Sequence, residues 1–248
     1  MRRRLMPLIV AALVIGMPVG AGAEPPTCQV PDDLTYTDAP LPRVAAAIKA
    51  KAPLKIMVVG TASSEGLGLS PPAKPYPAEL ERALKAMFPD SPIKMVVRAK
   101  RGETASTQST FMVRSVVPEK PVLVIWQTGT VDAVRAVDPG DFGDALIAGI
   151  DLMRYKGTDV ILMDMQYSTP TASVVNYPPY IDYMRRIAAS RQVMLFDRYE
   201  IMQYWSTSGI TSFVSTSKAK QQEDAEFVHR CIGRLLAQMI KAAVAAPR

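Results

Sequence analysis

The sequence contains few of the residue types on which metal and cysteine chemistry depend. Among its 248 residues there are one histidine and two cysteines. This scarcity disfavours zinc fingers, multi-histidine metal centres and cysteine frameworks, so we expect neither a metal nor a cofactor. The chain has 48% hydrophobic and 21% charged residues, which is ordinary for a globular protein. Disorder, collagen and coiled coil are therefore excluded.

Phosphate-binding and nucleic-acid signals are also missing. The pair Gly66 and Gly68 lacks the third glycine of a dinucleotide fingerprint, and no Gly-x-x-x-x-Gly-Lys-Ser/Thr is present. The acidic residues Asp138, Asp141 and Asp144 do not have the spacing of a calcium loop. The net charge of +6 is mild, and no basic run is interleaved with aromatic residues. We therefore expect no nucleic-acid partner.

The first 23 residues have the pattern of a signal peptide. A positive start, residues 1–4, precedes the apolar stretch 5–19, and Ala21-Gly22-Ala23 supplies small residues for a signal peptidase. Cleavage there would remove three arginines, lower the charge from +6 to +3 and leave no membrane span. We predict a periplasmic or secreted protein, with an uncleaved N-terminal anchor as the alternative.

A proline-rich arm and a short helix, residues 24–52, follow the predicted signal peptide. Cys28 lies in this arm, and Cys231 lies near the end of the chain. In an oxidising compartment the two cysteines either form one disulfide between the arm and the last helix, or remain two thiols.

The remainder, residues 53–246, reads as one α/β domain. Short apolar runs alternate with segments of helical spacing, and no linker or repeat divides them. Such a pattern predicts a mostly parallel five-stranded sheet in a three-layer α/β/α sandwich. The expected strands are 54–59, 93–97, 121–126, 159–163 and 193–196, and the expected helices are 43–51, 77–87, 107–117, 142–155, 180–189, 200–206 and 224–243.

Two adjacent serines, Ser63 and Ser64, follow the first expected strand. Ligand sites in such sheets lie beyond the carboxyl ends of the strands, where a serine hydroxyl is exposed to act as a nucleophile. A serine also needs a base, and the one histidine, His229, has Glu226 and Asp224 upstream to orient its ring. The alternatives are a loop that only caps a helix and a histidine on the polar face of the last helix.

The order of these pieces resembles the SGNH (GDSL-type) hydrolase superfamily, particularly its exported bacterial members. The resemblance is carried by VGTASSEG at 59–66, YPAEL at 76–80, VIWQTGT at 124–130 and MDMQYS at 163–168. It covers about residues 54 to 240 and implies the SGNH form of the α/β/α sandwich, with a flavodoxin-like arrangement and serine esterase activity.

In three of the four family blocks a functional group is lost or displaced. The family's serine position is occupied by Ala62, so a shift to Ser63 or Ser64 is needed. The second block has its glycine either displaced to Gly102 or replaced by Lys100, and the third block has Val131 in place of an amide donor. The last block keeps His229 but has a glutamate in place of its aspartate.

The resemblance implies that Ser63 or Ser64 is the nucleophile, His229 the base, and Glu226 or Asp224 its orienting carboxylate. The candidate oxyanion or substrate-binding residues are Gly102, Gln127, Gly129, Thr130 and Asp132, with Thr130 or Gln127 replacing the missing amide. Two functions stay open: an exported serine esterase that deacylates a small-molecule ester or an acylated envelope or extracellular glycan, and a degenerate SGNH-fold binding protein. Retention of the one histidine beside carboxylates, and of a double serine, favours the enzyme, with the binding protein as the alternative. The sequence predicts no oligomeric state.

Overall fold

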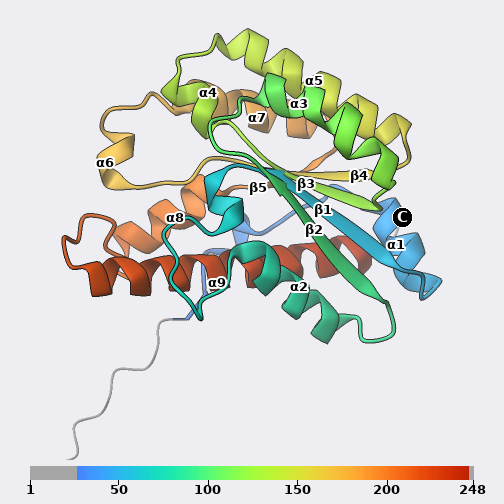
Figure 1. Ribbon diagram of the computed structural model, residues 1–248, viewed down its shortest axis with the longest axis horizontal. Helices are drawn as coiled ribbons and strands as arrows, with labels where there is room; N and C mark the ends of the chain where they lie inside the picture. The colour runs from blue at the N-terminus through green and yellow to red at the C-terminus, as the bar shows by residue number, and fades with distance from the viewer. Residues whose placement is uncertain (1–26, 246–248) are drawn as a thin grey trace, which may run out of the picture.

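A parallel five-stranded sheet forms the centre of the molecule (Figure 1). The computed structural model describes residues 27–245, with strands in the order β2-β1-β3-β4-β5. All five predicted strands are found, so the predicted fold class is confirmed. The strands are β1 (Leu54–Gly60), β2 (Ile93–Ala99), β3 (Leu123–Gln127), β4 (Asp159–Met163) and β5 (Met194–Phe196).

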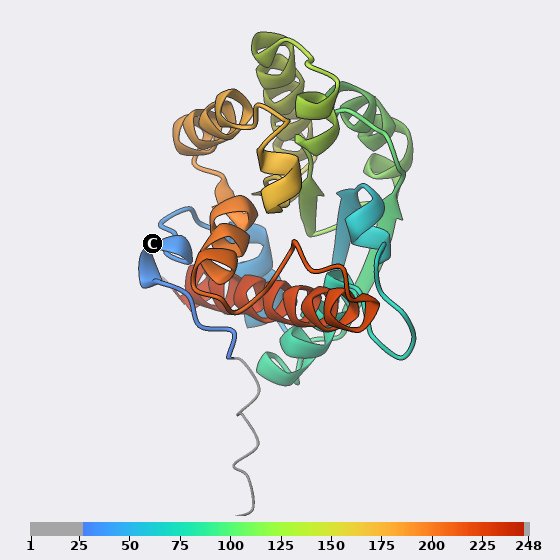
Figure 2. The same cartoon turned by 90° about the vertical axis from the view of Figure 1, so that its left-hand side faces the viewer.

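The sheet is apolar on both faces because helices cover both of them (Figure 2). Along β1, Ile56 and Val58 pack into one core, whereas Met57 and Val59 pack into the other. Successive side chains of a strand point to opposite faces, so a strand that is covered twice is a continuous hydrophobic run. This is why short apolar runs were a sufficient signal for the strands.

Helices α1, α2, α8 and α9 contribute to the core on one face, and α3, α5 and α7 contribute to the core on the other (Figure 1). The short helices α4 and α6 were not predicted, since each is at most five residues long. The helices are α1 (Pro42–Lys49), α2 (Tyr76–Met87), α3 (Ala105–Ser115), α4 (Thr130–Val134), α5 (Pro139–Tyr155), α6 (Thr169–Ala172), α7 (Pro178–Arg191), α8 (Arg198–Thr207) and α9 (Lys218–Ala245).

Helix α9 begins at Lys218, six residues before the predicted start at Asp224. The sequence did not indicate this extension, because its first residues are polar and carry no apolar period. His229 lies about three turns from the first residue of α9.

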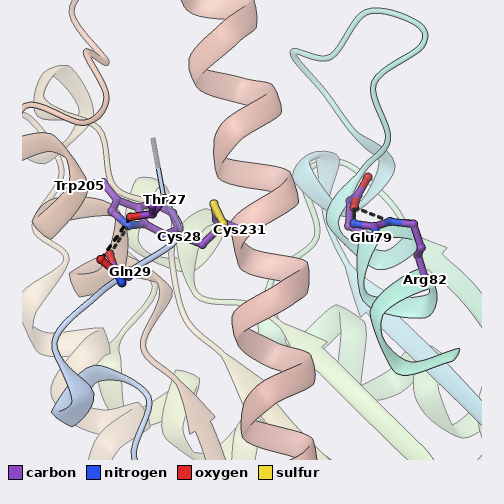
Figure 3. The surroundings of a disulfide bond; sticks show 7 residues. All are labelled: Thr27, Cys28, Gln29, Glu79, Arg82, Trp205 and Cys231. Carbon is purple, nitrogen blue, oxygen red and sulfur yellow. Dashed lines mark hydrogen bonds and ion pairs between the residues drawn. A yellow bond between two sulfur atoms is a disulfide. The ribbon is translucent and has the colours of Figure 1, made fainter. Parts of the chain in front are cut away.

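A disulfide joins Cys28 in the N-terminal arm to Cys231 in α9 (Figure 3). The two Cα atoms are 5.1 Å apart, although the residues are separated by 203 positions in the sequence. Trp205 of α8 adds a hydrogen bond from its indole nitrogen to the carbonyl oxygen of Gln29. Of the two alternatives left open by the sequence, the structure therefore has the disulfide, and it fixes the arm to the last helix.

The predicted signal peptide, residues 1–23, lies outside the described residues. Within residues 27–245, no helix is both long enough and apolar enough to span a membrane.

Candidate functional site

The carboxyl ends of the strands meet at one edge of the sheet, as predicted. There Gly60 accepts a hydrogen bond from the Lys100 backbone, and the backbone N–H of Thr128 donates to Met163. Asp164 continues this edge, since its backbone N–H donates to Phe196 at the end of β5. The strand order reverses between β1 and β3, which is the position where open α/β sheets bind ligands.

The two candidate serines occupy different environments in the 3-10 turn Ala62–Glu65 that follows β1. Ser64 is 1% exposed, and its hydroxyl lies 2.9 Å from the Tyr76 hydroxyl and 3.2 Å from Gln127 Oε1. Gly60 makes room for it, because a Cβ there would come within 2.1 Å of Ser64 Oγ. Ser64 is therefore held in the protein interior.

Ser63 instead lines a cavity of about 280 Å³ at the edge of the sheet, and His229 and Arg198 line the same cavity. The Nη1 atom of Arg198 donates to Ser63 Oγ at 3.0 Å. Burial lowers the pKa of Arg198 from its usual value, but an arginine side chain remains charged in proteins. The Ser63 hydroxyl is thus polarised by a buried positive charge.

The side chain of Gln127, at the end of β3, accepts hydrogen bonds from the serine turn. Its Oε1 accepts from the backbone N–H and the hydroxyl of Thr61, at 3.0 and 3.1 Å. A backbone N–H can only donate, so it is the oxygen of the amide that faces the turn. Ser63 Oγ lies 3.5 Å from the same oxygen. Toward this turn Gln127 is an acceptor, whereas an oxyanion site needs donors.

His229 is buried on α9 and contacts the start of α2. Its Nδ1 accepts a hydrogen bond from the backbone N–H of Tyr76 at 3.1 Å, and the two rings stack with centroids 6.2 Å apart. Because Nδ1 accepts, the proton of the neutral ring lies on Nε2. Burial, assisted by the positive charge of Arg198, lowers the pKa of His229 to about 3.

The two carboxylates expected to orient His229 have other partners. Asp224 accepts from the backbone N–H of Ser212 at 2.8 Å and pairs with Lys220 at 3.0 Å. Glu226 accepts from the Gln222 amide at 2.7 Å. Among residues 27–245, no hydrogen bond or ion pair is found between the imidazole and a carboxylate, or between the imidazole and either serine hydroxyl. The structure therefore brings Ser63, His229 and Asp224 to one cavity without joining them as a triad.

The remaining candidates form the neighbouring part of the edge. Gly102 lies in an exposed turn with φ +75°, and Gly129 adopts φ +93° directly before α4. A side chain at Gly129 would meet Met165 at 2.8 Å. Thr130 begins α4, and its buried hydroxyl has no partner among the described residues.

Asp132 caps helix α3. Both of its carboxylate oxygens accept from the backbone N–H of Ala105, at 3.0 and 3.1 Å. Burial raises the pKa of Asp132 despite these hydrogen bonds. Its contacts are those of a structural cap at the rim of the sheet.

Sequence reasoning missed Arg198 and the role of Asp164. Arg198 comes two residues after β5, so the rule that sites follow the strands would have found it if the loop after the fifth strand had been considered. Asp164 follows β4, and its Oδ1 accepts from the Tyr199 backbone at the start of α8. Burial and the nearby charge of Asp197 hold the pKa of Asp164 well above its usual range.

Comparison with known proteins identifies the family. The chain matches the model of the Non-GDSL lipase-like family over residues 27–246. It therefore belongs to this family, and with it to the SGNH/GDSL-type hydrolase superfamily. At the level of the family, the supported class of activity is that of an esterase or acylhydrolase. A search of curated proteins gives no match.

Solved structures share the fold. The crystal structure of TesA has 19% identity and a TM-score of 0.59, with 76% of this chain and 99% of that chain covered. A lipase/acylhydrolase from Enterococcus faecalis has 18% identity and a TM-score of 0.59, with 76% and 96% covered. The acetylxylan esterase Axe2 from Geobacillus stearothermophilus has 16% identity and a TM-score of 0.56, with 78% and 95% covered. At these identities the likeness establishes the fold.

Proposed function

We propose that this protein is an acyl-ester hydrolase in which Ser63 is the nucleophile. The observation that carries the proposal is the contact between the Arg198 guanidinium and Ser63 Oγ, 3.0 Å apart in a cavity at the carboxyl edge of the sheet. Attack of Oγ on an ester carbonyl forms a bond between the two and places negative charge on the carbonyl oxygen. A cationic donor beside Oγ stabilises that charge, and collapse of the intermediate releases the alcohol and leaves an acyl-serine for water to cleave.

Proton transfer is the demanding part of this chemistry. His229 can accept the serine proton at Nε2 only after its own proton has moved to Nδ1, and this requires loss of the hydrogen bond from Tyr76. Its pKa of about 3 also makes the resting imidazole a weak base. We therefore expect turnover to be slow unless a bound substrate changes the His229–Tyr76 contact.

The test is an aryl-acetate hydrolysis assay on Ser63→Ala, with Ser64→Ala as the matched control. If Ser63 is the nucleophile, its replacement lowers kcat/KM by ~10³-fold or more. Nucleophile and base act together, so the loss of either one removes most of the rate enhancement. Ser64→Ala retains activity, since its hydroxyl bonds Tyr76 and Gln127 in the interior. Equal activity in wild type and Ser63→Ala, both folded by circular dichroism, would reject the proposal.

The second candidate is a binding protein that uses the same cavity without turnover. The observation that favours it is the hydrogen bond from the Tyr76 N–H to His229 Nδ1, the nitrogen that a triad carboxylate would otherwise contact. Saturable binding of an ester or acylated sugar, with no product released over hours, would support this function over hydrolysis.

We further propose that the protein is exported and acts on an acylated glycan or a small ester outside the cytoplasm. The pattern of residues 1–23 and the disulfide between Cys28 and Cys231 support export, because disulfides persist in oxidising compartments. Intact-mass analysis of protein from the periplasm or the culture fluid tests it: a mature chain that begins at Glu24 is expected, and recovery of the 248-residue form alone contradicts cleavage.

A further inference from the structure

Arg198 is a buried cation without an acidic partner. Its side chain is 2% exposed, and it donates to two neutral groups, Ser63 Oγ at 3.0 Å and Gln166 Oε1 at 3.3 Å. Its Nε has no hydrogen-bond partner among residues 27–245. Over the same part of the chain, every ion pair within 4.0 Å is formed by other cations, among them Arg185 and Arg191.

A buried charge without a counter-ion is expensive, and proteins normally avoid it. The carboxyl group of Asp164 is near enough to interact with Arg198, but it lies outside ion-pair distance. Burial and the charge of Asp197 raise the pKa of Asp164 well above its usual range, whereas the charge of Arg198 lowers it. Among residues 27–245 no carboxylate lies within ion-pair distance of Arg198, and the side chain lines the cavity, so its positive charge is available to a group that enters there.

The lining of the cavity indicates the kind of anion. Arg198 is the one arginine or lysine among the residues that line it, and Asp224 contributes an acidic group at the same wall. A single positive charge matches a monoanion better than a doubly charged phosphate. The lining is mixed: Leu67, Met202, Phe213 and Val228 form its apolar part, beside polar side chains that include Gln166, Ser168, Ser212 and Gln221. The apolar part suits a short hydrocarbon tail, because ligand pockets combine apolar side chains with placed polar groups.

We propose that this cavity binds a small monocarboxylate with an apolar tail, and that its carboxylate sits against the guanidinium of Arg198. The guanidinium has a planar fork of donors that fits the two oxygens of a carboxylate. The proposal rests on the proposed function for the source of the ligand: hydrolysis of an ester at Ser63 would release a carboxylic acid into this cavity. Binding itself requires no turnover.

Hexanoate and its neutral isostere hexanamide are the probes. Calorimetric titration of the full mature protein should show hexanoate binding at least ~10-fold more tightly than hexanamide, as charge-assisted hydrogen bonds exceed neutral ones. Phosphate at the same ionic strength should bind no better than hexanamide. In Arg198→Met the preference for hexanoate should disappear, whereas in Arg191→Met, where the lost arginine pairs with Asp151 at 2.8 Å on the surface, it should remain.

Equal binding of hexanoate and hexanamide to the wild type would overturn the proposal, as would a preference that survives in Arg198→Met. Tighter binding of phosphate than of hexanoate would overturn it as well. If Arg198→Met does not fold, NMR of the wild-type protein tests the proposal instead. The imidazole signals belong to the sole histidine of the chain, His229, whose ring lines the cavity and therefore reports on a bound ligand. Hexanoate but not hexanamide should shift them, and no shift contradicts the proposal.

The aryl-acetate assay separates this proposal from the proposed function. Hexanoate preference without ester hydrolysis would leave carboxylate binding standing and remove the hydrolase. Hydrolysis that depends on Ser63, with no preference for hexanoate, would do the reverse.

Discussion

Acidification should destabilise this protein through His229, because the ring is buried in its neutral form. The pKa of His229 is lowered to about 3 by burial and by Arg198, whereas an unfolded histidine titrates near ~6.5. Below pH ~6.5 the histidine is therefore protonated in the unfolded state but stays neutral in the folded state. Stability from this group is fully present above pH ~6.5 and is lost as the pH falls toward about 3.

The size of the effect follows from linkage. Between pH 8 and pH 5 the two pKa values give a loss of about 2 kcal/mol in the free energy of unfolding, and thus ~4–8 °C in Tm for a domain of this size. Other groups titrate over the same range, so the quantity to measure is a difference between proteins. In His229→Asn the amide oxygen can still accept from the Tyr76 N–H, and the titrating group is gone. Wild type should lose about 2 kcal/mol more than this variant.

Urea denaturation at pH 8 and pH 5 measures the difference, and NMR of the imidazole gives an independent check. With one histidine in the chain, its signals need no assignment by mutation. In the folded protein they should remain those of the Nε2–H tautomer between pH 8 and pH 5, while urea-unfolded protein should titrate near pH ~6.5. A folded midpoint between pH 6 and 7.5, or equal acid losses in the two proteins, would show that the ring is an accessible base, and our account of the site would be wrong.

Three further changes test the fold around the site. Replacing Cys28 and Cys231 by serine should lower the free energy of unfolding by up to ~5 kcal/mol in urea denaturation, because the bond closes a loop with a separation of 203 residues; the variant should then be insensitive to reductant. Gly233→Ala should cost ~1–3 kcal/mol in the same assay, since its Cβ would lie 2.7 Å from a backbone nitrogen of α2. Substitution of the exposed Arg234 by alanine should change stability little. Asp132→Ala should cost ~1–2 kcal/mol, because it removes the acceptor of the first backbone N–H of α3; an unchanged Tm would contradict the capping role.

The sheet was predictable because its strands are buried on both faces. A run such as Val58 and Val59, or Trp126 beside Ile125, has no polar alternation, and in a chain with intervening helices this is typical of parallel strands. The position of the serine turn followed from the sheet, since the carboxyl edge is fixed by the strand direction. The ends of the elements were less certain: α9 starts with Lys218 and other polar residues, and its first turns lack the apolar period that marks a helix.

The partners of the site residues were not predictable, because they come from segments far apart in the sequence. The spacing in the sequence places Glu226 one helical turn before His229, but it does not fix where the Glu226 side chain points. In the structure its carboxylate accepts from Gln222 instead of from the imidazole. The actual partner of Nδ1 is the backbone of Tyr76, 153 positions away. Likewise, the contact between Arg198 and Ser63 joins the start of α8 to the turn after β1 across 135 positions. Only the fold brings these groups together.

The positive charge of Arg198 acts on both His229 and Ser63. A serine triad places a negative carboxylate beside the imidazole and so stabilises the charged ring. Here the charge that acts on His229 is the positive one of Arg198, while Asp224 pairs with Lys220 and Glu226 bonds Gln222. A site of this sign resists proton uptake by the imidazole and favours negative charge next to Ser63. The same arrangement makes the resting histidine a poor base, and it is the reason for our two proposals that the cavity holds an anionic oxygen, either in a reaction intermediate or in a bound carboxylate.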